Sequence, residues 1–403
     1  MKKRTLRVGT LFSGIGAFEE ALRQLNIPHE IKFACDNGEI EMIPLSAADK
    51  REYKKLDKKK NLTEQEKDRY NYLKGMIDGK IEHLRQVAQN FESKDAIHRF
   101  VKRVYRMYGA DKENMMKKSY LANYKKNIKE EDFYSDVRFL SGKFYKGDID
   151  IMVGGSPCQS FSTYGKKRGL EDTRGTLFYD YARIIDEVKP KIFIYENVPG
   201  LLTDDGGETW KFMIEVWKSL KYDVRWSKLN SRNYNHPQNR VRLFLIGFRK
   251  DIYNKPYDFP PKMELKLKSK DFLEPSPVDD RYYLGRKGFE WVTNKSKNKN
   301  KTRYNRDIIG CQTANQQFNW IGDLRVEKPT PHHYENPNIY IGSLNGEDAV
   351  ARKMTPRECL NLMGFSKDFK IVVEEKEAYR QSGNSIVVPV LKELIKSLED
   401  YLC

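Results

Sequence analysis

The stretch Ile149-Asp-Ile-Met-Val-Gly-Gly-Ser-Pro-Cys-Gln-Ser-Phe-Ser-Thr163 is the part of the chain that decides the fold. Its apolar start predicts a buried strand, and the polar run that follows predicts a loop stiffened by Pro157. Open α/β sheets carry reacting groups at the carboxyl ends of their strands, where this loop begins. A cysteine at a strand end is more often a small buried hydrophobe. The paired glycines before Cys158 and the polar residues after it favour a reactive thiol instead.

A second apolar run, Ile192-Phe-Ile-Tyr195, is followed directly by Glu196. Without context Glu196 is equally well a carboxylate that caps a strand end. Beside a thiol at the same sheet edge, it is a candidate proton donor whose pKa burial would raise. A free thiol is mostly protonated at neutral pH and needs positive potential nearby. Arg240 and Arg242 precede another apolar run, and the alternation of a strand places both on one face.

Strand and helix patterns alternate along most of the chain, which predicts an α/β fold with a doubly wound, mostly parallel sheet. Between about residues 45 and 130, glycine and proline almost vanish and apolar residues recur at helical spacing, so we expect a helical insertion there. The expected strands are 6–12, 31–36, 149–153, 192–195, 224–228 and 241–248, and the expected helices are 18–25, 176–188, 209–220 and 387–402.

Residues 250–345 are rich in Pro, Asn, Lys and Tyr and contain only short apolar runs. This composition predicts a second, smaller, loop-rich domain. Regular structure is expected to resume at Thr355, which can cap a helix whose first residue is Pro356. The expected division is therefore 1–249, 250–374 including a hinge, and 375–403 returning to the first domain.

Composition favours some classes of function and argues against others. The 403 residues carry a formal net charge of +17, which favours a polyanionic partner, although solubility alone also accounts for many lysines. Five cysteines without a Cys-x-x-Cys pair argue against a disulfide framework or a zinc site, so no metal is expected, and a reducing cytosol fits better. No apolar stretch of eighteen residues occurs, so no membrane partner is expected and the protein is predicted to be soluble and intracellular.

The first expected strand ends in the turn Gly14-Ile-Gly16, which permits close backbone approach to a ligand. Glu19 stands where a dinucleotide fingerprint has its third glycine, which disfavours a pyrophosphate. Asp36 ends the second strand, where a carboxylate can bind ribose hydroxyls. Together, the glycine turn and Asp36 fit an adenosine cofactor such as S-adenosyl-L-methionine. Without further context, these residues fit an ordinary turn equally well.

Six blocks in one order resemble the DNA (cytosine-5) methyltransferase family of the restriction–modification type. The blocks are Phe12-Ser-Gly-Ile-Gly-Ala-Phe18, Pro157-Cys-Gln159 with Gly169-Leu-Glu-Asp-Thr-Arg-Gly-Thr-Leu177, Glu196-Asn-Val198, Gln238-Asn-Arg-Val-Arg242, Arg352-Lys-Met-Thr-Pro-Arg-Glu358 with Met363-Gly-Phe365, and Gln381-Ser-Gly-Asn-Ser385. The resemblance covers residues 5–45, 130–250 and 350–403. It implies the Rossmann-like fold of S-adenosylmethionine-dependent methyltransferases, with residues 250–374 holding the target-recognition domain.

The resemblance implies a reaction and a set of catalytic residues. Cys158 would add to carbon 6 of a flipped-out cytosine while Glu196 protonates ring nitrogen 3, and carbon 5 would then take the methyl group. Arg240 would stabilise the polarised carbonyl of the base, and Arg242 would orient Glu196. The base must leave the stack for this geometry to exist.

The resemblance also implies cofactor-contacting positions and partners. The matching positions are Phe12, Ser13, Gly14, Ile15, Gly16, Asp36, Asp136, Pro157, Leu177, Asn384 and Ser385. Four residues depart from the family's usual pattern. Ser13 and Ala17 replace the commoner small residues of the first block, Ser156 stands where phenylalanine is usual, and Asp36 stands where glutamate is frequent. The implied partner is double-stranded DNA, with a cognate restriction endonuclease as a functional partner. We expect a monomer in the bacterial cytosol or nucleoid.

Three other functions fit parts of the sequence. A tRNA cytosine-5 methyltransferase would keep the fold and the chemistry, but the separate basic, loop-rich segment favours DNA. A non-catalytic DNA-binding regulator would be expected to lack part of the set formed by Cys158, Glu196 and Arg240, which is intact. A nicotinamide-dependent dehydrogenase is disfavoured by Glu19.

Overall fold

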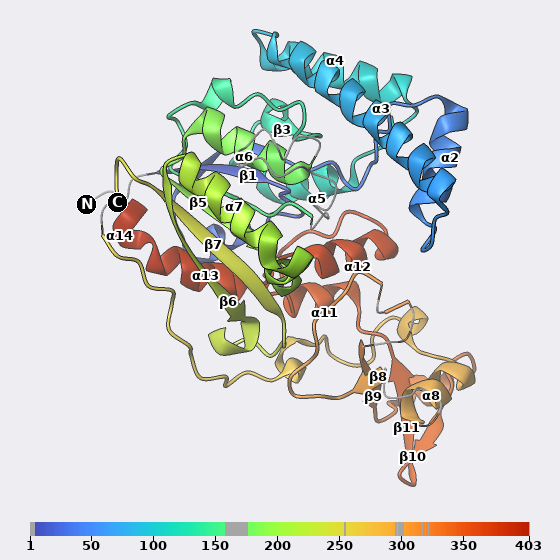
Figure 1. The fold of residues 1–403 in the computed structure, drawn as a ribbon. Helices are drawn as coiled ribbons and strands as arrows, with labels where there is room; N and C mark the ends of the chain where they lie inside the picture. The colour runs from blue at the N-terminus through green and yellow to red at the C-terminus, as the bar shows by residue number, and fades with distance from the viewer. Residues whose placement is uncertain are drawn as a thin grey trace.

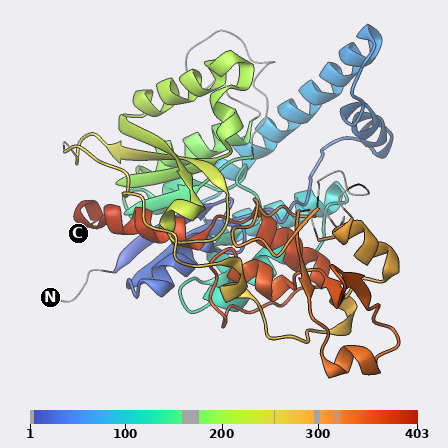
Figure 2. The same ribbon diagram turned by 90° about the horizontal axis from the view of Figure 1, so that it is seen from below.

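The computed structural model describes residues 5–157, 176–253, 255–294, 296, 302–315, 317–318, 320 and 322–402. Its main body is a seven-stranded sheet covered by helices, and a smaller four-stranded sheet lies to one side of it (Figure 1). Seen from below, the smaller sheet and the long helices of residues 47–107 project from the same side of the main body (Figure 2).

The large sheet has the strand order β3-β2-β1-β4-β5-β7-β6. All neighbouring pairs from β3 to β5 are parallel, and β7 runs antiparallel to both β5 and β6. Its strands are β1 (Leu6–Leu11), β2 (His29–Cys35), β3 (Phe133–Tyr134), β4 (Ile151–Gly154), β5 (Ile192–Asn197), β6 (Tyr222–Asn230) and β7 (Val241–Arg249). The prediction of a mostly parallel sheet is confirmed.

Helices cover both faces of this sheet because alternate strand residues point to opposite sides. Ile192 and Ile194 of β5 join the core under α1 (Ala17–Gln24), α5 (Met115–Tyr124) and α13 (Val388–Ser397). Phe193 and Tyr195 join the opposite core, under α6 (Leu177–Val188) and α7 (Glu208–Ser219). The sheet is doubly wound, as the sequence predicted.

The parallel register aligns the carboxyl ends of the central strands. Leu11 of β1 lies opposite both Cys35 of β2 and Gly154 of β4, and Gly154 lies opposite Tyr195 of β5. The residues that follow these strands therefore emerge along one edge of the sheet. This alignment places the glycine turn, Asp36, the loop leading to Cys158 and Glu196 within one region.

Residues 47–124 form four helices, which confirms the expected helical insertion: α2 (Ala47–Asp57), α3 (Glu64–Gln89), α4 (Lys94–Met107) and α5. Each begins at a side-chain cap, supplied by Ser46, Thr63, Ser93 and Asn114. The first three helices pack in two small cores, together with residues of the loop after β2 and with Phe139. In contrast, α5 returns to the sheet, where Tyr120 and Tyr124 are fully buried.

The smaller sheet has the order β10-β11-β9-β8, with strands β8 (Thr302–Tyr304), β9 (Gly322–Glu327), β10 (Gly342–Leu344) and β11 (Glu347–Arg352). It packs with α8 (Arg286–Thr293) around its own core, and α10 (Pro331–Glu335) follows β9. Its last residue, Arg352, is fully buried and forms a two-bonded ion pair with Glu358 at 2.8 and 2.9 Å. Glu358 belongs to α11 (Pro356–Asn361), which Thr355 caps as predicted.

The C-terminal part differs in detail from the expectation. A helix that was not predicted, α12 (Glu375–Asn384), precedes α13. The single helix expected over 387–402 is two helices, because α13 ends at Ser397 and α14 (Glu399–Leu402) follows it. Within the described residues, no helix is long and apolar enough to cross a membrane.

Candidate active site

Glu196 is the next-to-last residue of β5, and its side chain is only 16% exposed. Its Oε1 lies 3.2 Å from Nε of Arg242 on the neighbouring strand β7. Burial raises the pKa of Glu196 above its ordinary value, and the two arginines, Arg242 and Arg240, oppose this rise. A carboxyl with a raised pKa and a fixed cationic partner is suited to deliver a proton.

The segment that leads to Cys158 is fastened to the strand that carries Glu196. Oγ of Ser156 is 2.8 Å from the Tyr195 hydroxyl, and the Asn197 amide donates to the carbonyl of Ser156 at 3.0 Å. At Gly155, a Cβ atom would lie only 2.1 Å from the carbonyl oxygen of Glu196. The main chain just before the cysteine therefore contacts the main chain of the carboxyl residue. Cys158 itself lies outside the described residues.

The two arginines lie together, as the sequence predicted, and they share a neighbour that it did not identify. The sulfur of Cys311 is 3.3 Å from Nη1 of Arg240 and 3.9 Å from Nη2 of Arg242. Arg240 also donates to three main-chain carbonyls, those of Gln312 at 2.7 Å, Gly383 at 3.0 Å and Ser385 at 2.8 Å. Arg240 thus joins the segment between β8 and β9 to the C-terminal segment.

The glycine turn and Asp36 form a second part of the candidate site, at the carboxyl ends of β1 and β2. The Asp36 carboxylate accepts the N–H of Gly14 at 2.9 Å and that of Gly38 at 2.8 Å. These bonds use two of the about four acceptor positions of a carboxylate, so two remain for hydroxyl groups. A Cβ at Gly14 would meet nothing within 4 Å, which means that the turn borders open space. A partly buried acidic acceptor beside an open glycine turn fits the ribose of an adenosine cofactor.

The other residues of the first block shape this turn. Phe12, Gly14 and Gly16 all have positive φ angles, of 53°, 55° and 83°. Ser13 Oγ accepts the N–H of Cys35 at 3.0 Å, which joins the ends of β1 and β2. Ile15 is buried in the core.

Asp136 follows β3 and is almost fully buried. Its carboxylate accepts bonds from Nη2 of Arg138 at 2.6 Å, from Nε at 2.9 Å and from the Arg138 N–H at 3.0 Å. A fourth donor, the hydroxyl of Tyr105, reaches it from the insertion at 2.8 Å. The sequence had no signal for this last contact, because Tyr105 lies 31 residues earlier.

Four further expected cofactor positions lie near these segments. Asn384 is exposed and donates to Oε1 of Glu39 at 2.7 Å, which brings the end of α12 to the loop after Asp36. Ser385 is buried, and Leu177 is partly buried at the start of α6. Pro157 is exposed at the end of the described segment before Cys158.

Two glutamines of the segment between β8 and β9 make hydrogen bonds within the protein. Gln312 is buried and donates to the carbonyl of Cys359 at 3.2 Å. Gln317 is also buried and accepts the N–H of Met354 at 3.1 Å. Both side-chain amides therefore join the segment between β8 and β9 to residues 354–359.

Comparisons with known proteins agree with this arrangement. A family model described as C-5 cytosine-specific DNA methylase matches residues 103–400. The chain is 35% identical over 284 residues to Type II methyltransferase M1.ScrFI of Lactococcus lactis subsp. cremoris, covering 70% of each protein. It is also 35% identical over 284 residues to Type II methyltransferase M.HpaII of Haemophilus parainfluenzae, covering 67% of this chain and 77% of the relative.

Solved structures show the same fold at lower sequence identity. The crystal structure of the S. pombe Dnmt2 methyltransferase matches with a TM-score of 0.62 at 18% identity, covering 98% of this chain and 99% of that one. The family resemblance in the sequence is therefore confirmed. The chain belongs to the C-5 cytosine-specific DNA methylase family and is a DNA cytosine-5 methyltransferase.

Proposed function

We propose that this enzyme methylates carbon 5 of a flipped-out cytosine within a specific double-stranded DNA sequence, through a transient covalent bond to Cys158. The observation that carries the proposal is the contact between two strand ends: Glu196, paired with Arg242, lies against the Gly155-Ser156 segment that leads to Cys158. A nucleophile and a proton donor held at one sheet edge are what addition to a pyrimidine ring requires.

In the proposed mechanism, the Cys158 thiolate forms a bond to carbon 6 of the ring. Glu196 gives its proton to ring nitrogen 3, so the electron pair of the broken double bond makes carbon 5 nucleophilic. S-adenosyl-L-methionine, when bound, supplies a methyl group from its sulfonium. Carbon 5 then loses its proton to a base, the bond to Cys158 breaks, and ring nitrogen 3 returns its proton to Glu196 as the aromatic ring is restored.

The arginines have different parts in this proposal. Arg242 orients Glu196 through the 3.2 Å contact between Nε and the carboxylate. The family resemblance implied that Arg240 stabilises the polarised carbonyl of the base. Because Arg240 donates to three main-chain carbonyls, we assign it instead to holding the segments at Gln312 and Ser385 in place.

The cofactor residues are proposed on the same basis. Asp36 would bind ribose hydroxyls through its remaining acceptor positions, and the Gly14–Gly16 turn would allow close backbone approach. Phe12, Asp136, Pro157, Leu177 and Asn384 would surround the cofactor, as the family pattern implies. The net charge of +17 supports a DNA partner, and residues 250–374 are the proposed target-recognition part.

Transfer of a tritium-labelled methyl group from S-adenosylmethionine tests the proposal. Duplex plasmid DNA and bulk tRNA serve as the two substrates. Bisulfite sequencing of the plasmid identifies the DNA sequence that the enzyme recognises. We expect labelling of DNA alone, and we expect Cys158→Ser to abolish it while retaining DNA binding. Labelling of tRNA alone would refute the DNA assignment, and normal turnover by Cys158→Ser would refute the nucleophile.

A further inference from the structure

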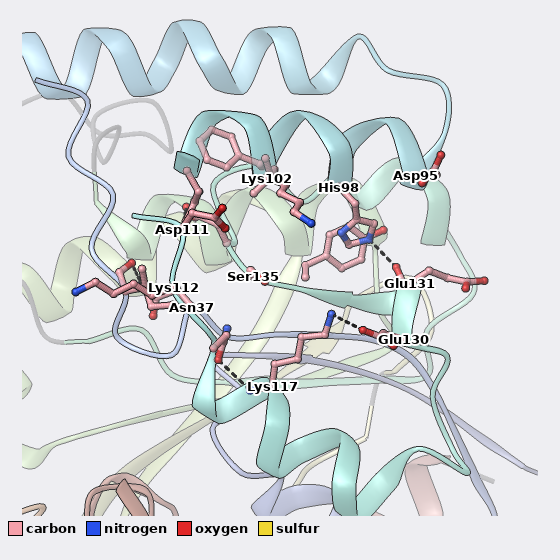
Figure 3. A pocket seen from close by; sticks show the side chains of 17 residues that line it. Asn37, Asp95, His98, Lys102, Asp111, Lys112, Lys117, Glu130, Glu131 and Ser135 are labelled. Carbon is pink, nitrogen blue, oxygen red and sulfur yellow. Dashed lines mark hydrogen bonds and ion pairs between the residues drawn. The ribbon is translucent and has the colours of Figure 1, made fainter. Parts of the chain in front are cut away.

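The helical insertion reaches the proposed cofactor region through α4 and α5. These helices, the loop after β2 and the residues around β3 enclose a cavity of about 500 Å³ (Figure 3). Both signs of charge line it, among them Lys102, Lys117 and Glu130. Several side chains of α4 and α5 bridge to the residues around β3 and after β2, including Lys94, which pairs with Asp132 at 2.6 Å, and Lys117, which pairs with Glu130 at 3.1 Å.

Asn114 is one of these bridging side chains. Its Nδ2 donates to the main-chain carbonyl of Asp36 at 2.7 Å, while its Oδ1 accepts the N–H of Lys117 at 2.9 Å and so caps α5. Gly38 packs so closely that a Cβ there would lie 2.4 Å from Oδ1 of Asn114. The first turn of α5 is thus fixed directly to the residue proposed to bind ribose.

Tyr105 is a second bridging side chain that reaches a residue of the proposed cofactor region. Its hydroxyl donates to Oδ2 of Asp136 at 2.8 Å, from the last turn of α4. Burial raises the pKa of Tyr105, so the hydroxyl stays protonated and remains a donor. Arg138 supplies the other bonds to this carboxylate. Tyr105 therefore connects the last turn of α4 to Asp136, the second acidic position of the proposed cofactor region.

We propose that Asn114 and Tyr105 are positioning residues for S-adenosylmethionine, which they act upon through Asp36 and Asp136. The inference rests on the proposed function, since that function assigns these two acidic residues to the cofactor. It gives the insertion a role in cofactor affinity. Without these two bonds, Asp36 and Asp136 would lose the hydrogen bonds that they receive from the insertion.

Two conservative variants test the proposal. Tyr105→Phe removes one hydroxyl and keeps the ring in its apolar surroundings. Asn114→Ser keeps a residue that caps helices well but is too short to reach the Asp36 carbonyl. We expect each to raise the dissociation constant of S-adenosylmethionine and its KM about three- to tenfold, with kcat at saturating cofactor changed less than about twofold.

Tyr70→Phe is the matched control, because Tyr70 also donates to an aspartate, Oδ1 of Asp57 at 3.0 Å, in the same insertion but outside the lining of the cavity. It should bind the cofactor as the wild type does. Calorimetric titration of the DNA-free enzyme measures these affinities. Wild-type affinity in both Tyr105→Phe and Asn114→Ser, or an equal loss in the control, would overturn the proposal. Absence of cofactor binding in the wild type would instead overturn the proposed function.

Discussion

Replacing Gly155 by alanine should separate Glu196 from the loop that carries Cys158. Gly155 follows β4, and an added Cβ would lie 2.1 Å from the carbonyl oxygen of Glu196 and 3.2 Å from its Oε2. Real Cβ atoms essentially never approach another heavy atom closer than 3.0 Å. The nearest atom belongs to the backbone of a central strand, so it cannot turn aside as the end of a flexible side chain can.

The size of the effect follows from this overlap. The ends of β4 and β5 must move apart by about 0.9 Å to bring the contact to 3.0 Å. Added volume in a packed region lowers the free energy of unfolding by about 1–3 kcal/mol. A displacement of about 1 Å between reacting groups reduces turnover roughly a hundredfold. Turnover should therefore fall far more than the amount of folded protein.

Methyl transfer to duplex DNA and urea denaturation, measured on the same preparation, check this expectation. Gly200→Ala is the control, because Gly200 lies just after β5, the strand of Glu196, and a Cβ there would meet nothing within 4 Å. It should retain wild-type turnover and stability. If Gly155→Ala is as active as Gly200→Ala, the close contact between the two strand ends has no catalytic role.

Two further predictions concern stability. Because burial raises the pKa of Glu196, the stability that its protonated form contributes is present below its ordinary value of 4.5 and is lost as pH rises through the folded-state value. The free energy of unfolding of Glu196→Gln, measured by urea denaturation, should therefore increase relative to that of the wild type as pH rises above 4.5. A relative decrease would contradict the raised pKa. Arg352→Met should lower the free energy of unfolding by about 3–5 kcal/mol, because it leaves the Glu358 carboxylate buried without its partner. Arg225→Met, which breaks an exposed pair, should cost less than about 1 kcal/mol by the same method, and equal losses in the two variants would refute the argument.

The sequence was sufficient for six of the seven strands of the large sheet because they are short apolar runs between clear turns, whereas the two-residue strand β3 was not expected. Residues 192–195 were expected as a strand, and β5 does begin at Ile192. It continues to Asn197 because Glu196 and Asn197 pair with Phe244 and Leu243 of β7. A polar residue at a strand end gives no local sign of such pairing, so only the partner strand extends the element.

The candidate site was predictable where its residues adjoin strands and not where they come from distant segments. The placement of Arg240 and Arg242 together followed from strand alternation. Cys311 follows no strand and has no spacing signal, so its contact with both arginines could not be foreseen. The same holds for Tyr105, whose bond to Asp136 depends on how the insertion folds back.

One departure from the family pattern now has a physical explanation. Ser156 replaces the usual phenylalanine, and in the structure its side chain is buried against the hydroxyl of Tyr195 at 2.8 Å. Asn197 completes the network by donating to both Tyr195 and the Ser156 carbonyl. A phenylalanine at position 156 could not make this hydrogen bond. The serine therefore supplies the partner that the buried hydroxyl of Tyr195 needs.

The most direct measurement is to incubate the enzyme and S-adenosylmethionine with duplex DNA that carries 5-fluorocytosine at the target. Fluorine cannot leave as a proton, so the covalent intermediate should accumulate and survive denaturation. Peptide mass spectrometry should then locate the DNA adduct on Cys158. Failure of any adduct to form on DNA that is methylated when it carries cytosine, or an adduct on Cys311, would contradict the account.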